Sequence, residues 1–557
     1  MDAFSGDRLE TAVARMIEEA RSRGPEASGA PSAPGMSAAE AFSGPGLGAL
    51  PGLPMAKETA LATPSPPDVP SALPAPGGFK AVPGTPVAGV STWASLSPPW
   101  PGTPTAPEPD GAGLVAFARR VREGNAAQGR GPCFAHDEEG LRRVFGPGAA
   151  PSPRPFDVHL VRRDFPALHQ DVHGKRLVWM DNGATTQKPR SVIDAVSRFY
   201  ERDNSNIHRG AHALAARATD AYEGAREKVR AFVGAASAKD IVFARGTTEA
   251  INLAAYAFGA KFLAPGDEIL VSTLEHHADI VPWQLVAKER GAVLKAIPVD
   301  DRGEIDLASY EALLGPRTRI VALTQASNTI GTILPLPLMI HAAKRRGARV
   351  LVDGAQGVSH LPVDVRALGC DFYAFSGHKI FAPTGIGALY VHPDLQELLP
   401  PWQGGGNMIR DVTFERTTYS EAPARFEAGT PNIADAVGLG AALDYVRALG
   451  LAATGAWEHR LLERATEGLA RVPGLRILGS PAAKVSVLSF VLKNHTTEAV
   501  GQALDKEGIA VRAGHHCAQP SLRRFGVETA VRPSFAFYNT FEEVDRLVEA
   551  VRRIAKV

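Results

Sequence analysis

The chain has 557 residues, of which 45% are hydrophobic, and a formal net charge of +1. That length predicts two or three domains, and the near-neutral charge argues against an electrostatic grip on nucleic acid or an anionic membrane. Three cysteines cannot form a disulfide framework, no signal peptide is recognisable, and no run reaches the roughly 20 apolar residues that span a bilayer. We therefore expect a cytoplasmic protein.

Residues 1–150 are predicted to be a disordered extension, because residues 25–110 are rich in Pro, Gly, Ala and Ser and carry almost no charge. Short patches with helical spacing interrupt it at residues 9–20, 114–121 and 141–145. Helices this short are unstable alone in water. They either dock back on the rest of the chain or act as adhesive motifs that seek grooves on another protein. The long Pro-rich spacer favours the second interpretation.

From about residue 155 the pattern predicts an α/β fold. Five nearly continuous apolar runs are typical of parallel strands covered on both faces: residues 240–244, 268–272, 319–324, 349–352 and 372–375. Helices at 436–447 and 456–470 then precede a strand at 485–491 and a final helix at 541–554. We expect a large domain over residues 151–422 and a smaller α+β domain over residues 423–557.

Polar residues follow each of the five strands, where open α/β sheets bind ligands. They are Gly246-Thr247-Thr248-Glu249, Glu275-His276-His277, Ser327-Asn328, Asp353 with Gln356, and Ser376-Gly377-His378-Lys379. Any one set could be a helix cap or a satisfied core group. Five in succession at one sheet edge argue against that interpretation.

These side chains suit pyridoxal 5′-phosphate (PLP). A lysine just after a strand, Lys379, can hold an aldehyde cofactor as a Schiff base, and Asp353 can pair with the pyridinium nitrogen. His276 can stack on the ring, and Gln356 can donate to the ring oxygen. The candidates for the phosphate are Thr247, Thr248, Ser376 and His378. The adjacent histidine pairs are poorly disposed to share one metal ion, so no metal is expected.

Near the C-terminus, Cys517 closes the segment Arg512-Ala513-Gly514-His515-His516-Cys517. A thiolate is the reactive form of cysteine, and neighbouring histidines can favour it. An inert core cysteine is the alternative, but the glycine and the two histidines indicate a polar loop. Cys370 lies in an apolar run and is interpreted as structural, and Cys133 has no visible partner. A Schiff-base lysine with a nucleophilic cysteine indicates an enzyme that moves sulfur.

From about residue 156 to the end, the chain resembles the PLP-dependent cysteine desulfurases of the Suf type (group II), which have fold type I. The resemblance is carried by the motifs above together with Trp179-Met180-Asp181-Asn182-Gly183-Ala184, residues 206–212, residues 426–431 and residues 532–539. It implies a large domain with a mostly parallel seven-stranded sheet and a small C-terminal α+β domain.

The resemblance also implies the chemistry. L-cysteine becomes L-alanine, Lys379 removes the Cα proton, and Cys517 accepts the sulfur as a persulfide. Arg532 would anchor the substrate carboxylate, with Asn328 and Arg512 in support. Thr430 would reach the cofactor phosphate of a neighbouring subunit, which implies a homodimer. Pro533 departs from the small residue that usually follows this arginine and leaves the details of the carboxylate clamp open.

The N-terminal extension resembles the targeting segment of desulfurases packaged in family-two encapsulin shells. This implies that residues 1–150 bind a shell protein and place the enzyme inside an encapsulin nanocompartment. Four alternatives stay open: a selenocysteine lyase, a free Suf-type desulfurase for iron–sulfur cluster assembly, a PLP aminotransferase or epimerase, and a non-enzymatic scaffold. The sequence does not name the sulfur-acceptor protein.

Overall fold

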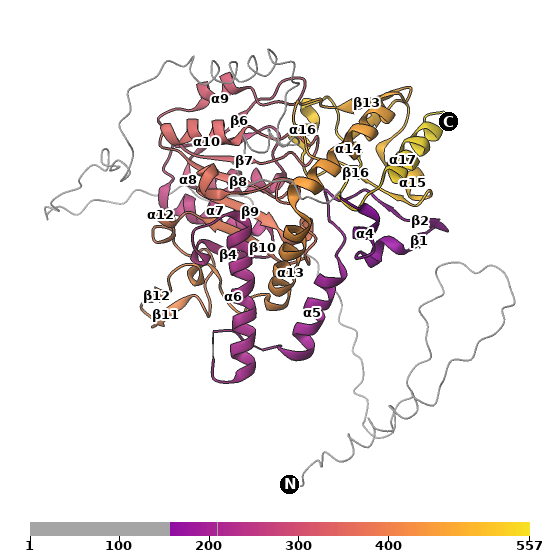
Figure 1. Ribbon diagram of the computed structural model, residues 1–557. Coiled ribbons are helices and arrows are strands. Elements are labelled where there is room, and N and C mark those ends of the chain that lie inside the picture. Colours follow the sequence, from indigo (N-terminus) through magenta and orange to yellow (C-terminus); the bar gives the residue numbers. More distant parts are fainter. Residues whose placement is uncertain (1–155, 209, 557) are drawn as a thin grey trace, which may run out of the picture. The chain divides into compact units, whose positions relative to one another are not determined.

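The computed structural model describes residues 156–208 and 210–556 (Figure 1). The predicted extension over residues 1–150, its helical patches and Cys133 lie outside these residues.

A seven-stranded sheet forms the centre of the described chain, with the strand order β4-β10-β9-β8-β7-β5-β6. The pairs from β9 to β6 are parallel, whereas β10 runs antiparallel to both β9 and β4. The fold type I, mostly parallel architecture is therefore confirmed. The strands are β4 (Ile241–Ala244), β5 (Glu268–Ser272), β6 (Val293–Ile297), β7 (Thr318–Thr324), β8 (Arg349–Asp353), β9 (Phe372–Ser376) and β10 (Gly387–Val391).

The five predicted strands lie within one residue of β4, β5, β7, β8 and β9 at each end. β6 and β10 were not among them. In β6 the apolar run is broken by Lys295, because this strand is at the sheet edge and is half-exposed. The run in β10 is short and begins with Gly387.

Helices cover both faces of this sheet, which explains why its strands are apolar throughout. In β8, Val350 and Val352 belong to one buried cluster and Leu351 to another on the opposite face. The helices of this part are α5 (Arg190–Arg202), α6 (Ala213–Val233), α7 (Thr247–Phe262), α8 (Val281–Arg290), α9 (Leu307–Leu313), α10 (Leu336–Arg345), α11 (Val365–Leu368), α12 (Pro393–Gln396) and α13 (Ile433–Leu449). The described chain also contains five 3₁₀ turns: η1 (Pro166–His169), η2 (Ala238–Asp240), η3 (His277–Asp279), η4 (Gly377–Lys379) and η5 (Ala424–Phe426).

A second sheet, with the order β13-β14-β17-β16, packs against C-terminal helices. Its strands are β13 (Leu475–Leu478), β14 (Ser489–Leu492), β16 (Arg512–Gly514) and β17 (Ala530–Arg532). The helices are α14 (Leu451–Ala470), α15 (Thr497–Asp505), α16 (Gln519–Arg524) and α17 (Phe541–Ile554). The predicted helix at 541–554 is confirmed, and those at 436–447 and 456–470 form the larger parts of α13 and α14.

The predicted strand at 485–491 is wrong in its first half. The N–H of Val485 donates to the carbonyl of Gly331 (2.8 Å), and Lys484 bridges to Thr332. These apolar residues are therefore buried against the loop after β7 and do not extend β14. The predicted boundary between the large and the small domain at residue 423 stays a prediction. The buried residues of α13 share a cluster with those of α5 and α6, and Figure 1 draws these three helices together.

The first described elements lie against the last ones. They are α4 (Val158–Arg162), β1 (Asp171–Val172), β2 (Lys175–Arg176) and β3 (Val178–Trp179). β3 pairs in parallel with β15 (Ile509–Ala510), and Asp181 bridges to Ser534. The residues just after β3 are consequently fixed beside β16 and β17.

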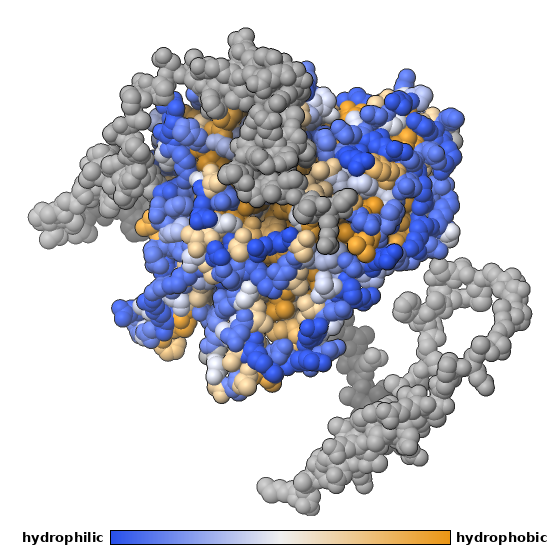
Figure 2. Space-filling model, viewed as in Figure 1, coloured by the Kyte–Doolittle hydropathy of each residue, from blue (hydrophilic) through white to orange (hydrophobic). Residues whose placement is uncertain are grey.

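One hairpin, made of β11 (Ile409–Val412) and β12 (Thr417–Tyr419), carries apolar side chains on the surface. Phe414, between its strands, is fully exposed, and Val412 and Tyr419 are exposed as well. Figure 2 shows this projection at the lower left as a mixture of hydrophilic and apolar residues. Across the described ranges no single helix is long and apolar enough to cross a membrane, although α13 and α14, bent by 78°, would pass by length and composition as a pair.

Candidate active site

The carboxyl ends of β7, β8 and β9 bring the central predicted residues together. Lys379 ends η4, directly after β9, and Asp353 ends β8. Burial lowers the pKa of Lys379, Asp353 raises it, and Arg532 lowers it further. Cys517 also interacts electrostatically with this lysine. The adjacent strands β8 and β9 therefore bring Asp353 and Lys379 to one edge of the sheet.

The predicted phosphate site lies where β4 meets α7. The backbone N–H of Thr247 donates to Ser376 Oγ (2.8 Å), and the two hydroxyl oxygens are 2.7 Å apart. Gly246, the N-cap residue of α7, supplies no side-chain cap. A Cβ on Gly246, whose φ is 154°, would lie 3.0 Å from Ser376 Oγ. The N-terminus of α7, which its own N-cap residue does not cap, and the close approach of Gly246 to Ser376 form a cradle that suits a phosphate.

The other two phosphate candidates are placed less directly. Thr248 is exposed in the first turn of α7, and its carbonyl accepts a bond from Asn252. The backbone carbonyl of His378 accepts from the N–H of Thr186 (3.0 Å), and this bond holds η4 against the segment that precedes α5. Burial lowers the pKa of the His378 ring to about 4. Phosphate contacts by these two side chains stay predictions.

Of the two residues predicted to hold the PLP ring, Asp353 is buried and His276 is half-buried, and their contacts with the ring stay predictions. Asp353 is 3% exposed, and its Oδ1 accepts from the N–H of Ala355 (2.8 Å). Burial raises the pKa of Asp353, and Lys379 opposes that shift. Burial lowers the pKa of His276 to about 3, so its ring is neutral near pH 7. Because its Nδ1 accepts from the N–H of Ala278 (3.0 Å), the ring proton is on Nε2.

Gln356 has a partner that the sequence did not indicate. Its Nε2 donates to the carbonyl of Gly183 (2.7 Å), so the side chain ties β8 to the segment after β3. The second amide hydrogen is the one left for a ring oxygen, and that contact stays a prediction.

The loop that carries Cys517 is docked on the large sheet's edge. The N–H of His277 donates to the Cys517 carbonyl (2.7 Å), and Asn328 Nδ2 donates to the carbonyl of His516 (2.7 Å). His516 and Cys517 have φ angles of 52° and 53°, and such left-handed conformations in residues other than glycine cluster at functional sites. The thiol of Cys517 is free and exposed.

The two histidines beside Cys517 differ in their burial and in their contacts. Burial and Arg532 lower the pKa of His516 to about 3, so its neutral ring cannot offer the thiolate a positive charge near pH 7. His515 stacks on His277 with ring centroids 5.8 Å apart, and its Nδ1 accepts from the N–H of Cys517 (3.0 Å). A role of His515 in favouring the thiolate stays a prediction.

Arg532 is 2% exposed and keeps part of its guanidinium available. Nη1 donates to the Asn328 carbonyl (2.8 Å), whereas Nε has no hydrogen-bond partner in the described chain. The Asn328 Oδ1 is buried and likewise without a donor there. Burial lowers the pKa of Arg532 to about 10, which still leaves it cationic near pH 7. An unpaired donor and an unpaired acceptor, both buried, suit an amino acid ligand.

Asp181 is the residue of the site to which the sequence assigned no role. Its carboxylate lies 2.9 Å from Arg512 Nη2 and 3.6 Å from Arg532 Nη2. It stood in a quoted motif, but no spacing rule connects residue 181 with residues more than 300 positions away.

Thr430 is not brought to the other predicted residues. It is exposed, and its Oγ1 donates to Asn206 Oδ1 (3.0 Å). Cys370 is buried with its Sγ 3.9 Å from the carbonyl of Val365, and burial raises its pKa, as expected for a structural thiol. In the described residues no group of three or more His, Cys, Asp or Glu side chains could hold a metal ion.

Comparisons with known proteins agree with this geometry. Residues 178–547 match the family "Aminotransferase class-V". The chain is 62% identical over 399 residues to the cysteine desulfurase of Synechococcus elongatus, which covers 72% of this chain and 64% of that protein. It is 51% identical over 403 residues to the cysteine desulfurase of Dickeya dadantii, covering 72% of this chain and 98% of that protein. The chain thus spans less than two thirds of the first relative's length.

Solved structures give the same fold. The cysteine desulfurase CsdA (S-sulfonic acid) of Escherichia coli is 42% identical with a TM-score of 0.68, covering 72% of this chain and 99% of that one. The apo cysteine desulfurase of Thermococcus onnurineus is 37% identical with a TM-score of 0.69, covering 73% and 100%. The predictions of an enzyme and of PLP as its cofactor are confirmed. The chain belongs to the class-V aminotransferase family of PLP-dependent enzymes.

Proposed function

We propose that this chain is a cysteine desulfurase that converts L-cysteine to L-alanine and takes the sulfur onto Cys517. The observation that carries the proposal is that a loop bonded to residues after β5 and β7 presents the exposed thiol of Cys517 at the sheet edge where Lys379 and Asp353 follow β9 and β8. An aminotransferase needs the lysine and the aspartate, but it has no use for an exposed cysteine on a loop fixed at the same site.

Binding comes first in the mechanism. The substrate carboxylate would bind the Nε edge of Arg532, and Asn328 Oδ1 would accept a hydrogen from the substrate. Thr247, Ser376 and Gly246 would hold the phosphate of PLP, and Asp353 would face its ring nitrogen. When bound, PLP supplies an acceptor for the electrons released at the substrate Cα.

Proton and sulfur transfer then fall to two residues. Lys379, whose pKa burial lowers, is suited to act as the neutral base that removes the Cα proton through Nζ. The Cys517 thiolate attacks the substrate Sγ, so that the S–S bond forms as the Cβ–Sγ bond breaks. The sum is balanced: L-cysteine and the Cys517 thiol give L-alanine and the Cys517 persulfide.

The test is alanine release from L-cysteine by the PLP-loaded enzyme and two variants. Cys517→Ser should lose at least about 100-fold in turnover while keeping the cofactor's visible absorbance, because the nucleophile alone is removed. Lys379→Ala should lose that absorbance band. Cys370→Ala, at the buried thiol, is the control that should keep turnover. Undiminished alanine release by Cys517→Ser would favour the aminotransferase or epimerase alternative, and assays on selenocysteine would separate a lyase.

We also propose that the enzyme is a homodimer. Thr430 is exposed, and the β11–β12 hairpin presents Phe414 fully to solvent, as expected for surfaces that a second copy covers. Light scattering should give twice the chain mass, and Phe414→Ser should weaken the association. A monomeric wild type that is fully active would contradict this.

For the N-terminal part, we propose that residues 1–150 attach the enzyme to the inner wall of an encapsulin shell. The composition of this segment and its resemblance to shell-targeting segments support the proposal. Co-expression with a family-two shell protein should capture the full chain but not a chain that begins at residue 155. Capture of both, or of neither, would assign residues 1–150 another role and leave a free desulfurase.

A further inference from the structure

One carboxylate lies between the two arginines of the proposed substrate site. Asp181 is 9% exposed, and Arg512 holds it with Nη2 at 2.9 Å from Oδ2 and Nε at 3.4 Å from Oδ1. Arg532 Nη2 lies 3.6 Å from the same Oδ1. Burial raises the pKa of Asp181, and both arginines oppose that shift. The 2.9 Å contact makes this carboxylate an ion-pair partner of Arg512, so the group adds one negative charge to the site.

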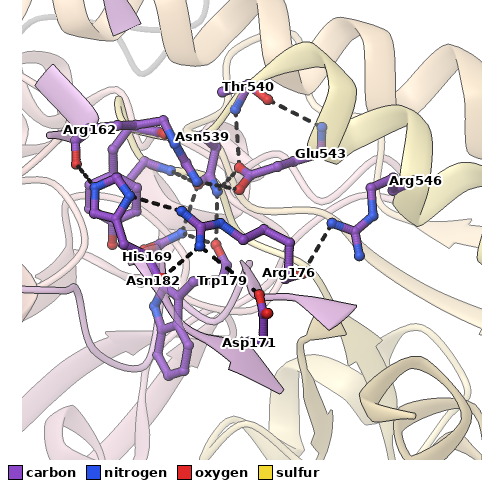
Figure 3. Close-up of polar contacts among 12 residues, drawn as sticks. Arg162, His169, Asp171, Arg176, Trp179, Asn182, Asn539, Thr540, Glu543 and Arg546 are labelled. Atoms are coloured by element: carbon purple, nitrogen blue, oxygen red, sulfur yellow. Dashed lines mark hydrogen bonds and ion pairs between the residues drawn. The ribbon is translucent and has the colours of Figure 1, made fainter. Parts of the chain in front are cut away.

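The position of this carboxylate is fixed by the backbone that follows it. Asn182 Nδ2 donates to the carbonyl of Ser534 (2.7 Å) and to Asn539 Oδ1 (3.1 Å), while Tyr538 donates to Asn182 Oδ1. Asn539 in turn donates to Glu543 (2.8 Å), and Figure 3 shows Asn182 and Asn539 within this chain of contacts. The backbone next to Asp181 therefore cannot shift without breaking buried hydrogen bonds.

Gly183 explains how closely Arg532 approaches the backbone after Asp181. A Cβ on Gly183 would be 3.1 Å from Arg532 Nη2, and the N–H of Gly183 donates to Ser534 Oγ (2.8 Å). The guanidinium is packed against this backbone, with Nη1 on the Asn328 carbonyl and Nε unpaired. One edge of Arg532 is thus open to a carboxylate, whereas Arg512 already has its carboxylate partner in Asp181.

The charges then decide what the site accepts. Arg512 and Arg532 contribute two positive charges and Asp181 one negative charge, so these three side chains together carry a net charge of +1. A ligand with a second anionic group near Arg512 would meet Asp181, and like charges at close range are strongly unfavourable in a buried site.

We propose that Asp181 is a specificity-determining residue, which restricts the site to amino acids with a single carboxylate by occupying Arg512 and repelling a second anion. The inference rests on the proposed function, because it takes Arg532 as the carboxylate anchor. It adds that dicarboxylic amino acids and their analogues are excluded by a built-in negative charge.

The test compares two unreactive probes of equal chain length, succinate and butyrate, on the PLP-loaded enzyme by calorimetric titration. In Asp181→Asn the ratio of succinate to butyrate affinity should rise about tenfold or more over wild type, since Arg512 becomes free. In Arg512→Gln, at a half-exposed side chain, the ratio should not rise above that of wild type. The matched control is Asp267→Asn, at a buried carboxylate 3.0 Å from Arg319, which should leave the ratio unchanged.

Two failures are distinguishable. An Asp181→Asn enzyme with wild-type secondary structure and an unchanged ratio would overturn the specificity role, as would equal losses for both probes. If Asp181→Asn does not fold, the Arg512→Gln variant decides. A ratio of succinate to butyrate affinity in Arg512→Gln that exceeds the wild-type ratio would overturn the specificity role of Asp181. If Arg532→Lys leaves the affinity for butyrate unchanged, the carboxylate anchor of the proposed function is itself wrong.

Discussion

Three histidines of the site hold a neutral ring near pH 7 because burial disfavours their charged forms. Burial lowers the pKa of His276 and His516 to about 3 and that of His378 to about 4. Each unfolded histidine has a pKa of about 6.5. The unfolded chain therefore binds more protons than the folded chain between about pH 6.5 and pH 4.

This difference predicts how stability depends on pH. The contribution of these histidines is present above pH 6.5 and is lost as the pH falls toward 4, because unfolding lets the rings take up protons. The free energy of unfolding of the apo-protein should decline over this interval, as measured by urea titration. His516→Gln should make the decline less steep, whereas the control substitution His159→Gln, at an exposed position, should leave it unchanged. An equally steep decline in His516→Gln would contradict the assignment.

A single methyl group added at the proposed phosphate cradle should weaken the binding of PLP. In Gly246→Ala the new Cβ would lie 3.0 Å from Ser376 Oγ, at a φ of 154° that favours glycine. Strain of about 1–3 kcal/mol would raise the dissociation constant of PLP by about 5-fold to 150-fold, measured by quenching of apo-protein fluorescence.

The matched control is Gly224→Ala inside α6, where nothing lies within 4 Å of the new Cβ. This change should leave PLP affinity unaltered and raise the free energy of unfolding by about 0.5–1 kcal/mol, since alanine is the better helix former. Equal losses of affinity in both variants would mean that the cradle is not the phosphate site.

At the scale of elements, α6 is joined to the segment after η5 by a buried ion pair. Arg226 Nη1 lies 2.6 Å from Glu427 Oε1, and both side chains are nearly inaccessible. Glu427 also accepts from the N–H of Phe243 (2.7 Å) in β4 and from the hydroxyl of Tyr222 (3.1 Å). This one carboxylate connects a helix, an edge strand and the segment that leads to Thr430.

Removing one partner of this pair should cost more than removing both. Arg226→Met leaves an uncompensated buried carboxylate and should lower the free energy of unfolding by about 3–5 kcal/mol. The double variant Arg226→Met with Glu427→Met should be more stable than either single variant, as measured by thermal and urea unfolding. Additive losses in the double variant would contradict the pairing.

At the scale of the whole molecule, the beginning and end of the described chain stabilise each other. Arg162 in α4 lies 2.9 Å from Glu543 in α17, and Arg546 in α17 donates to the carbonyl of Arg176 (3.1 Å). Figure 3 shows these contacts around Arg162 and Glu543, next to Asn182 and Asn539. Through Glu543, α4 is thus linked to Asn539, which is bonded to Asn182 beside Asp181.

This arrangement predicts a long-range effect of one substitution. Arg162→Met should lower the free energy of unfolding by about 3 kcal/mol, because Glu543 is buried and would lose its cationic partner. Hydrogen exchange should quicken in α17, more than 370 residues away in sequence. Arg163→Met, at the exposed neighbouring position, should stay within about 0.5 kcal/mol of wild type.

The sequence predicted what local periodicity and strand-end chemistry determine. Continuous apolar runs located β5 to within a residue, and polar residues after β8 and β9 located Asp353 and Lys379. It did not predict the half-exposed edge strand β6, or residues 485–487, because a loop from the other sheet covers them. The role of Asp181 was also missed, since its partners are defined only by the pairing of β3 with β15. Contacts between distant segments, rather than local preference, account for these cases.

The docking of the Cys517 loop bears on what happens after catalysis. The N–H of His277 and the amide of Asn328 hold this loop at both Cys517 and His516, while the thiol itself is exposed. The sulfur atom of the proposed persulfide would consequently be delivered at a stationary point of the surface. An acceptor would have to supply the movement, and the rate of hand-off would depend on how deeply its own nucleophile can reach.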